Sequence, residues 1–248
     1  MVIKDILKDV LKHTHGLGIF EMVKITGEVD KTNIETVDAD KTVIFKGETL
    51  NPVPEFVDST VGLSRMGVLQ GYLQYPGFDE DGSNVSVVTQ ERNGEDVPVE
   101  VEFTAKDGNN ANYRFMLADV INQQLKSVTM KDIPWDVTIV PTQKNLKDIN
   151  NFNGILGGFE PVFSPTTESG ALYFHIGEGA GDKVKLPINN NVDGELSGNW
   201  KWETDKTLSI LRLSDSANCT VSFANAGAMQ IVIDSGLGEY TYILPAKS

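Results

Sequence analysis

The sequence is poor in cysteine and contains no long apolar run. Cys219 is the only cysteine among the 248 residues, which excludes an internal disulfide and a zinc site built on cysteines. No apolar stretch approaches the ~18 residues of a membrane-spanning helix, and the N-terminal residues lack the apolar core of a signal peptide. We therefore expect a soluble cytoplasmic protein without a membrane partner.

Positive charge is also scarce. The chain has 21 Lys and Arg residues against 35 Asp and Glu residues, which gives a net charge of −14. This balance argues against general affinity for nucleic acid, because phosphate binding grows with the number of cations presented. The acidic residues gather in predicted loops such as 79–81 and 91–95, whereas lysines lie in predicted helices. The sequence is therefore compatible with a few cations concentrated on one surface.

Recognisable catalytic patterns are missing as well. Glu100 and Glu102 alternate within a predicted strand, which is typical of a solvated face rather than of a glycosidase carboxylate pair. His13 and His15 have no third metal ligand near them in the sequence. Residues 177–182 lack the Lys-Ser/Thr ending of a phosphate loop and are expected to form a hairpin turn. We expect no enzyme, and therefore no catalytic residue, no metal and no cofactor.

Residues 3–13 are expected to form an amphipathic helix. Its apolar residues fall on one arc: Ile3, Ile6, Leu7, Val10 and Leu11. Its lysines form a narrow stripe beside that arc: Lys4, Lys8 and Lys12. Like charges at this spacing cost a helix roughly 0.2–0.5 kcal/mol per pair. Two interpretations remain open, a solvated helix face or a surface that binds a polyanion.

The predicted elements follow nearly the same order in both halves of the chain, which indicates two α+β domains. We place these domains at 1–116 and 135–248, with a connector at 117–134 in which 118–125 could be helical. In the first half, helices are expected at 3–13 and 60–74 and strands at 19–26, 32–37, 42–46, 85–91, 97–103 and 111–115. In the second half, helices are expected at 142–152 and 206–213 and strands at 136–140, 158–163, 171–176, 183–188, 220–224, 228–233 and 240–244.

Each of the four main predicted helices carries basic residues in this acidic chain. Arg65 is the only charged residue of helix 60–74. The second half contributes Lys144 and Lys147 on one helix and Lys206 and Arg212 on the other. One shared basic surface is a simpler explanation than four independent coincidences.

Several stretches, in this order and spacing, resemble DNA sliding clamps. They are the lysine-bearing helix 3–13, residues 58–73, Tyr113-Arg114-Phe115, Ile133-Pro134, residues 142–149 and residues 240–244. The resemblance is to the clamps of T-even-type phages in particular, which are related in fold to proliferating cell nuclear antigen. It implies a toroidal homotrimer with two similar domains per subunit, each with two helices packed on antiparallel sheet, and with the helices lining the hole.

The resemblance also implies roles for particular residues. The DNA-facing surface would comprise Lys4, Lys8, Lys12, Arg65, Lys144, Lys147, Lys206 and Arg212. DNA polymerase and clamp loader would bind near the connector and the C-terminal tail, at Val120, Ile121, Leu125, Ile133, Trp135, Leu244 and Pro245. Subunits would join through strands 111–115 and 183–188, with Tyr113, Phe115, Val184 and Leu186 at the contact.

One departure from the resemblance is visible, because almost no strand precedes the first helix whereas 136–140 precedes its counterpart.

The function implied is a sliding clamp that encircles duplex DNA without sequence preference and tethers the replicative polymerase, in the host cytoplasm if the protein is phage-encoded. The alternative is a β-rich virion structural or adhesion protein with no role on DNA.

Overall fold

The computed structural model describes residues 2–92, 94–127, 132–156, 158, 161–177, 181–214 and 218–247. This part of the chain is a mixed α+β structure with antiparallel sheets, which confirms the predicted fold class. The chain forms two compact units. Unit 1 comprises Met1–Lys41, Phe45–Val128 and Gly236–Tyr240, and unit 2 comprises Thr42–Ile44, Thr129–Ser235 and Thr241–Ser248. Among the described residues, no helix is both long and apolar enough to cross a membrane.

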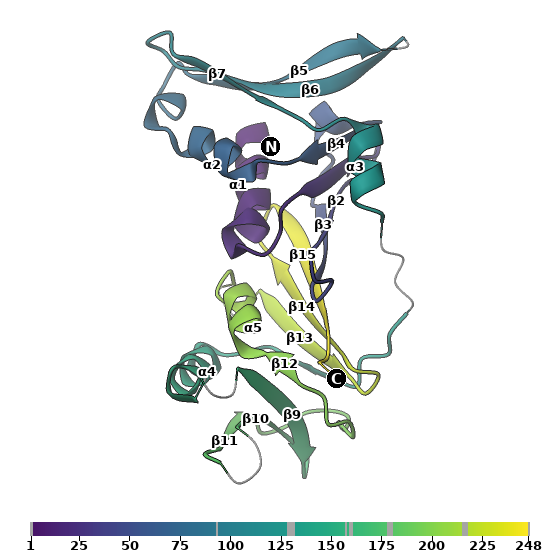
Figure 1. Cartoon of the computed structure of the whole chain (residues 1–248), viewed down its shortest axis with the longest axis vertical. Helices are drawn as coiled ribbons and strands as arrows, with labels where there is room; N and C mark the ends of the chain where they lie inside the picture. Colours follow the sequence, from purple (N-terminus) through teal and green to yellow (C-terminus); the bar gives the residue numbers. More distant parts are fainter. Residues whose placement is uncertain are drawn as a thin grey trace. The chain divides into compact units, whose positions relative to one another are not determined.

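Unit 1 contains two antiparallel sheets and three α-helices (Figure 1). Its helices are α1 (Ile3–His13), α2 (Met66–Gln74) and α3 (Ala118–Gln124). Its strands are β1 (Val23–Gly27), β2 (Thr32–Val37), β3 (Ile44–Thr49), β4 (Thr60–Leu63), β5 (Asn84–Arg92), β6 (Glu95–Thr104) and β7 (Asn110–Arg114). One sheet has the order β4-β1-β2-β3, with the first residues of β15 (Gly238–Pro245) beside β3, and the other has the order β5-β6-β7.

Helix α1 packs its apolar arc into the core of unit 1. The five residues predicted to form this arc are all at most 4% exposed: Ile3, Ile6, Leu7, Val10 and Leu11. At the end of the helix, the His13 ring stacks on Tyr240 at 4.1 Å between ring centroids. The Tyr240 hydroxyl donates a hydrogen bond of 2.7 Å to Asp9 Oδ2. The predicted amphipathic helix is therefore confirmed, with its apolar arc buried.

The predicted helix 60–74 is wrong in its first part. Residues Thr60–Leu63 form strand β4, which pairs antiparallel with β1, and the helix begins only at Met66. Gly62 explains the difference, because its N–H donates to the Met116 carbonyl at 2.9 Å and its carbonyl accepts the Met116 N–H at 2.8 Å. Arg65 then adopts a left-handed conformation with φ of 51°, which separates the strand from the helix.

Helix α3 confirms the helix suggested at 118–125. Ile121 on this helix is fully buried. After the helix, the exposed Ser127 is attached to the sheet of unit 1, where it accepts a hydrogen bond from buried Lys24 and donates one to Glu35 at 2.9 Å. Residues 128–131 of the predicted connector lie outside the described residues.

Unit 2 repeats the order of elements with one extra strand at its start. Its helices are α4 (Gln143–Leu156) and α5 (Thr204–Leu211). Its strands are β8 (Val137–Ile139), β9 (Val162–Glu168), β10 (Ala171–Ile176), β11 (Val184–Asn189), β12 (Trp202–Glu203), β13 (Cys219–Ala224), β14 (Ala228–Asp234) and most of β15. The sheets have the orders β15-β14-β13-β8 and β11-β10-β9-β12. No strand precedes α1 in the described chain, so the predicted departure is confirmed.

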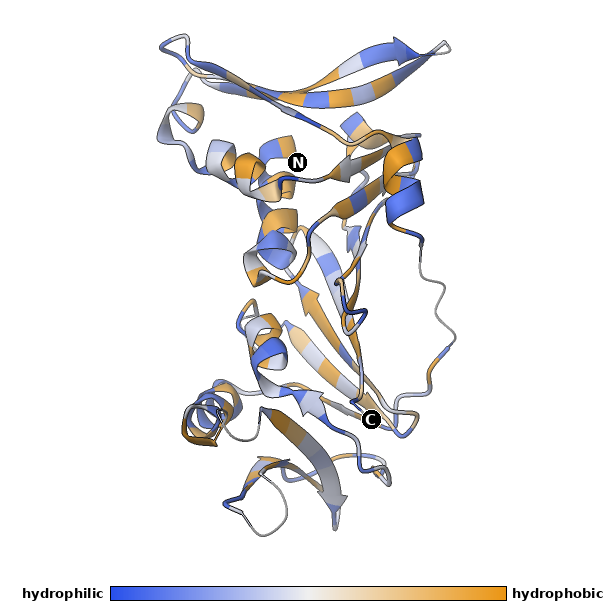
Figure 2. Cartoon of the chain, in the orientation of Figure 1, coloured by the Kyte–Doolittle hydropathy of each residue, from blue (hydrophilic) through white to orange (hydrophobic). Residues whose placement is uncertain are grey.

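Local chemistry accounts for most of these elements. Strand β6 alternates hydrophilic and hydrophobic residues, and Val101 and Phe103 are buried while Glu102 is exposed (Figure 2). Helix α4 begins after Thr142, whose hydroxyl accepts the Asn145 N–H at 3.1 Å, as expected of an N-cap. The helix extends beyond the predicted residue 152 to Leu156, and β1 begins at Val23 rather than at residue 19. Part of the predicted hairpin turn 177–182, residues 178–180, lies outside the described residues.

Candidate nucleic-acid interface

The lysine stripe of α1 is partly neutralised by a carboxylate from another element. Lys4 Nζ contacts Asp79 Oδ1 and also donates a hydrogen bond of 2.5 Å to the Phe78 carbonyl. Lys8 Nζ lies 3.4 Å from Asp79 Oδ2. The Lys4 hydrogen bond and the two ammonium charges hold the pKa of Asp79 below its usual range. One carboxylate therefore bridges two lysines and offsets the repulsion that their spacing creates.

Asp79 is held in place by an apolar anchor. It ends the 3-10 helix η3 (Pro76–Phe78), whose Phe78 side chain is 4% exposed. The Phe78 ring packs against Tyr75 and Phe103, with centroid distances of 5.0 and 5.3 Å. The Asp79 side chain is 60% exposed and faces the lysines, although 75 residues separate it from Lys4 in the sequence.

The other cations of unit 1 are less constrained. Lys12 is exposed and makes no ion pair within the described residues. Arg65 is exposed at the N-terminus of α2, with its guanidinium carbon 6.0 Å from the centre of the Tyr113 ring. Helix α2 carries no charged residue and exposes 43% of Val68, and Tyr75, which follows the helix, is also 43% exposed. The surface of α2 is therefore uncharged and partly apolar rather than basic.

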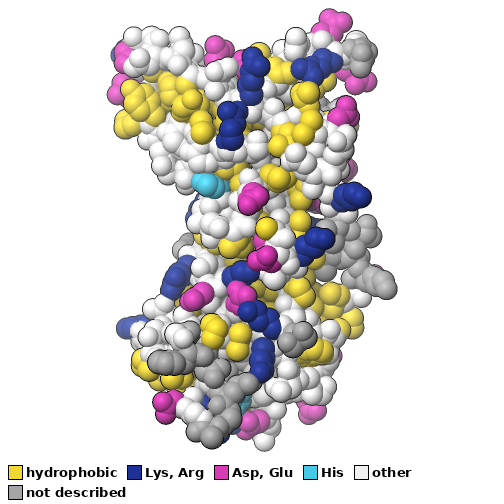
Figure 3. Space-filling model, viewed as in Figure 1, with side chains coloured by type: hydrophobic (Ala, Val, Ile, Leu, Met, Phe, Trp, Pro, Cys, Tyr) yellow, Lys and Arg dark blue, Asp and Glu magenta, His cyan; other side chains and the backbone are white. Residues whose placement is uncertain are grey.

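In unit 2, one lysine of α4 makes an ion pair and the other does not. Lys144 Nζ lies 2.5 Å from Asp148 Oδ2, one helical turn along. Lys147 is exposed and makes no ion pair in the described part of the chain. Arg212, at the end of α5, donates a hydrogen bond to Asn150 of α4. Figure 3 shows Lys and Arg side chains at separate places on one face, with acidic side chains among them.

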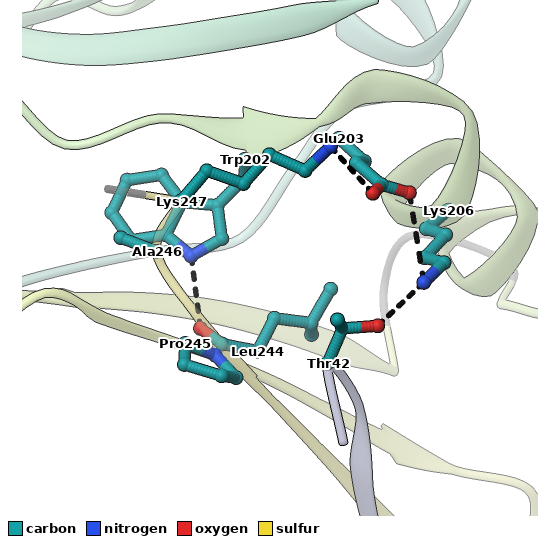
Figure 4. A pocket seen from close by; sticks show the side chains of 8 residues that line it. All are labelled: Thr42, Trp202, Glu203, Lys206, Leu244, Pro245, Ala246 and Lys247. Atoms are coloured by element: carbon teal, nitrogen blue, oxygen red, sulfur yellow. Dashed lines mark hydrogen bonds and ion pairs between the residues drawn. The ribbon is translucent and has the colours of Figure 1, made fainter. Parts of the chain in front are cut away.

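Lys206 lies in a pocket of unit 2 (Figure 4). This cavity of about 310 Å³ is lined by Thr42, Trp202, Glu203, Lys206, Leu244, Pro245, Ala246 and Lys247. Glu203 lies 2.7 Å from Lys247 and 3.6 Å from Lys206, and the Lys206 ammonium also donates to Thr42 at 2.5 Å. Burial alone would raise the pKa of Glu203, but the two ammonium groups outweigh burial and lower it. The pocket therefore combines an apolar wall with a fixed charge pair and an additional lysine.

The predicted partner-binding residues differ in exposure. Three are buried, namely Ile121, Leu125 and Leu244, at 0%, 5% and 3% exposure. Val120 and Pro245 are exposed, whereas Ile133 and Trp135 are half-buried. The predicted set thus contributes only Leu244 and Pro245 to the pocket, and the side chains of Ile121 and Leu125 belong to the core of unit 1.

Three of the predicted subunit-contact residues lie on strands at sheet edges, and Phe115 directly follows one of these strands. β7 and β11 are terminal strands in their sheets. The side chains of Tyr113, Phe115 and Leu186 are nevertheless buried, and the Tyr113 hydroxyl donates to the Ser64 carbonyl. Burial raises the pKa of Tyr113 to about 12. A contact at these edges therefore depends on the backbone of the strands, with half-buried Val184 as the remaining predicted side chain.

The described residues contain no group of three or more His, Cys, Asp or Glu side chains placed to hold a metal ion. His13 is fully buried, and burial lowers its pKa to about 4. His15 is half-buried, with Nε2 3.4 Å from where a Cβ on Gly67 would lie.

The contact of Asp79 with α1 and most of the pocket were not predicted from the sequence. Asp79 stands in an acidic run that is typical of a solvated loop, and no local pattern indicates its long-range contact with α1. Trp202 and Glu203 precede a predicted helix, and nothing in their neighbourhood along the chain indicates a binding role. Thr42 and Lys247 are far apart in the sequence, so only the tertiary fold brings them together.

No protein-family model and no curated sequence matches this chain. Solved structures of proliferating cell nuclear antigen (PCNA) are similar to it along almost its whole length. The Thermococcus kodakaraensis PCNA shares 12% identity at a TM-score of 0.70, covering 97% of each chain. The A. fulgidus PCNA, solved with the C-terminal region of FEN-1, shares 10% identity at a TM-score of 0.72 over 99% of this chain and 96% of its own. The Entamoeba histolytica PCNA shares 11% identity at a TM-score of 0.64 over 100% and 95%. The chain therefore has the PCNA-like clamp fold.

Proposed function

We propose that the chain is a sliding clamp that encircles duplex DNA and tethers a replicative DNA polymerase. The observation that carries this proposal is the full-length PCNA-like fold of a duplicated chain in which α1, α4 and α5 carry lysines. A clamp holds DNA by topology, so its phosphate contacts need to be weak and independent of sequence. Scattered lysines in a chain of net charge −14 suit this requirement, because the acidic remainder discourages binding elsewhere.

The DNA-facing surface in this proposal is the set of residues predicted from the sequence. Arg65, Lys12 and Lys147 are its most available members, since all three are exposed and make no ion pair within the described residues. Lys206 is a weaker candidate because Glu203 and Thr42 already hold its ammonium group in the pocket. If it is encoded by a T-even-type phage, the protein would act in the host cytoplasm.

The polymerase and the clamp loader would dock at the pocket of unit 2. Leu244, Pro245 and Ala246 supply its apolar wall, and Lys206 and Lys247 outnumber the Glu203 charge. A peptide with apolar side chains beside an acidic residue fits this lining.

The homotrimer would form by strand pairing between copies. In unit 1, β3 pairs with the start of β15, and Leu50 N–H donates to the Leu237 carbonyl at 2.9 Å. β3 is the third strand after α1, and β15 is the last strand of the second half. In the same way, β11 is the third strand after α4, and β7 is the last strand of the first half. Pairing of β11 with β7 of the next copy would repeat the same interaction and close a ring.

The helices that contact these edge strands present apolar residues. α2 contacts β7 and exposes Val68, and α4 contacts β11 and exposes 66% of Ile155. Figure 3 shows hydrophobic side chains gathered over α2. Covering Val68 and Ile155 in a subunit interface would remove this apolar surface from water.

Solution mass and particle images test the proposal. Sedimentation equilibrium is expected to give three times the 27.1 kDa chain mass, and negative-stain images are expected to show a ring with a central hole. A monomer at all accessible concentrations, or an elongated fibre, would contradict the proposal and favour a virion structural role.

A further inference from the structure

The lysines of α1 and α4 that are predicted to face DNA are of two kinds. Lys4, Lys8 and Lys144 contact a carboxylate of their own chain, whereas Lys12 and Lys147 are exposed and make no ion pair within the described residues. The same division occurs on α1 of unit 1 and on α4 of unit 2. The carboxylate comes from a different place in each unit, since Asp79 lies in a loop distant in sequence from α1 and Asp148 lies on α4 itself.

We propose that Asp79 and Asp148 regulate the DNA contact by occupying these lysines until a phosphate displaces them. This inference rests on the proposed clamp function. A phosphate that approaches Lys8 or Lys144 exchanges one anionic partner for another, so the contact stabilises the complex little in water. The displaced carboxylate stays nearby and competes for the lysine as soon as the phosphate moves on. Such exchange keeps each contact weak, which a sliding protein requires.

The geometry at Asp79 indicates which lysine exchanges. The Lys4 side chain is 12% exposed and its ammonium is also held by the Phe78 carbonyl. The Lys8 side chain is 39% exposed, and its ammonium lies 3.4 Å from the carboxylate, a longer contact. Lys8 therefore leaves Asp79 more readily, while Lys4 keeps the carboxylate in position. In unit 2, Lys144 is the exchanging residue, since its side chain is 78% exposed.

Salt-dependent binding to a short fluorescent duplex tests the inference. The variants are Asp79→Asn and Asp148→Asn, which remove the competing charge while keeping the shape of the side chain. Asp81→Asn is the matched control, because Asp81 is an exposed acid of the same loop that makes no ion pair in the described chain. All three change the net charge equally, so the change in net charge alone does not produce a difference between them.

We expect Asp79→Asn and Asp148→Asn to bind more tightly than Asp81→Asn. Each further phosphate that a released lysine neutralises should make the slope of log affinity against log salt steeper by about 0.9 per copy of the chain. Adding Lys8→Gln to Asp79→Asn should abolish most of that increase in slope, whereas adding Lys4→Gln should abolish less. Equal slopes for Asp79→Asn and Asp81→Asn would overturn the inference.

The failure of the inference is distinguishable from failure of the proposed function. If Lys12→Gln weakens binding while Asp79→Asn and Asp148→Asn behave as the control, the protein binds DNA but its carboxylates do not compete. If neither wild type nor any variant shows salt-dependent binding to the duplex, both the inference and the DNA contact of the clamp are wrong.

Discussion

At the scale of single residues, the lysine stripe of α1 is not a uniform basic surface. The Lys4 side chain is mostly buried, and its ammonium contacts both Asp79 and the Phe78 carbonyl. The Lys8 side chain is half-buried, and Lys12 is exposed. Position on the helix wheel therefore does not decide which lysine is available to a phosphate. The tertiary contact with Asp79 decides it.

Lys12→Gln is expected to weaken duplex binding more than Lys4→Gln. Loss of one phosphate contact should make the salt slope shallower by about 0.9 per copy, whereas loss of Lys4 removes an ammonium group already occupied by Asp79. Fluorescence anisotropy titrations at several salt concentrations measure both slopes. If the two variants weakened duplex binding equally, the contact with Asp79 would not keep Lys4 from binding phosphate.

His13 makes stability depend on pH. Burial lowers its pKa to about 4, below the ordinary value of 6.5, so the unfolded chain binds a proton at a pH where the folded protein does not. The stabilising difference is complete above pH 6.5 and is lost as the pH falls toward 4. His13→Phe keeps the ring beside Tyr240 and removes the titration.

Urea unfolding at about pH 7.5 and about pH 5 measures this effect. Between these values, wild type should lose roughly 2 kcal/mol of unfolding free energy more than His13→Phe does. Equal losses for both proteins would contradict the assignment to His13.

At the scale of elements, the glycines of residues 60–74 have different roles. A Cβ on Gly62 would lie 2.9 Å from Ile121 Cβ and from Met116 Cβ, because α3 packs directly on β4. A Cβ on Gly71 would meet no atom within 4 Å. Gly62 therefore serves close packing, whereas Gly71 only weakens its helix.

Gly62→Ala is expected to lower the free energy of unfolding by roughly 1–3 kcal/mol, because the added methyl group overpacks the contact with Ile121. Gly71→Ala is the matched control and should raise it by up to about 1 kcal/mol through helix propensity. Urea unfolding monitored by circular dichroism measures both. Similar effects of the same sign would contradict the distinction.

Much of this element order could be predicted from the sequence, because hydrophobic periodicity and turn residues are local signals. The buried arc of α1 and the N-cap at Thr142 are examples. The division between β4 and α2 could not, since it depends on the pairing of Gly62 with Met116 and on the left-handed Arg65. The bridging role of Asp79 and the pocket around Glu203 are also set by long-range contacts, which no local pattern encodes.

At the scale of the whole molecule, assembly depends on surfaces that a single chain leaves exposed. Val68→Asp and Ile155→Asp are each expected to convert the trimer to monomers, because either charge would be buried in the proposed interface. Both residues are exposed in the chain, so folding should change by less than about 0.5 kcal/mol.

Sedimentation equilibrium measures the mass of these variants, and circular dichroism checks that they are folded. Val29→Asp is the control, since Val29 is 74% exposed and lies in the turn between β1 and β2. It should leave the mass unchanged. A trimer that persists in both interface variants would place the subunit contact elsewhere.

Retention on circular DNA tests the central claim, encirclement, most directly. The protein is threaded onto linear duplex DNA, the ends are ligated, and the closed circle is separated from free protein in high salt. A single restriction cut then reopens the circle. The proposed clamp should stay with the closed circle and be lost rapidly after the cut, because topology rather than affinity holds it. Equally fast loss from the closed and the cut DNA would contradict encirclement.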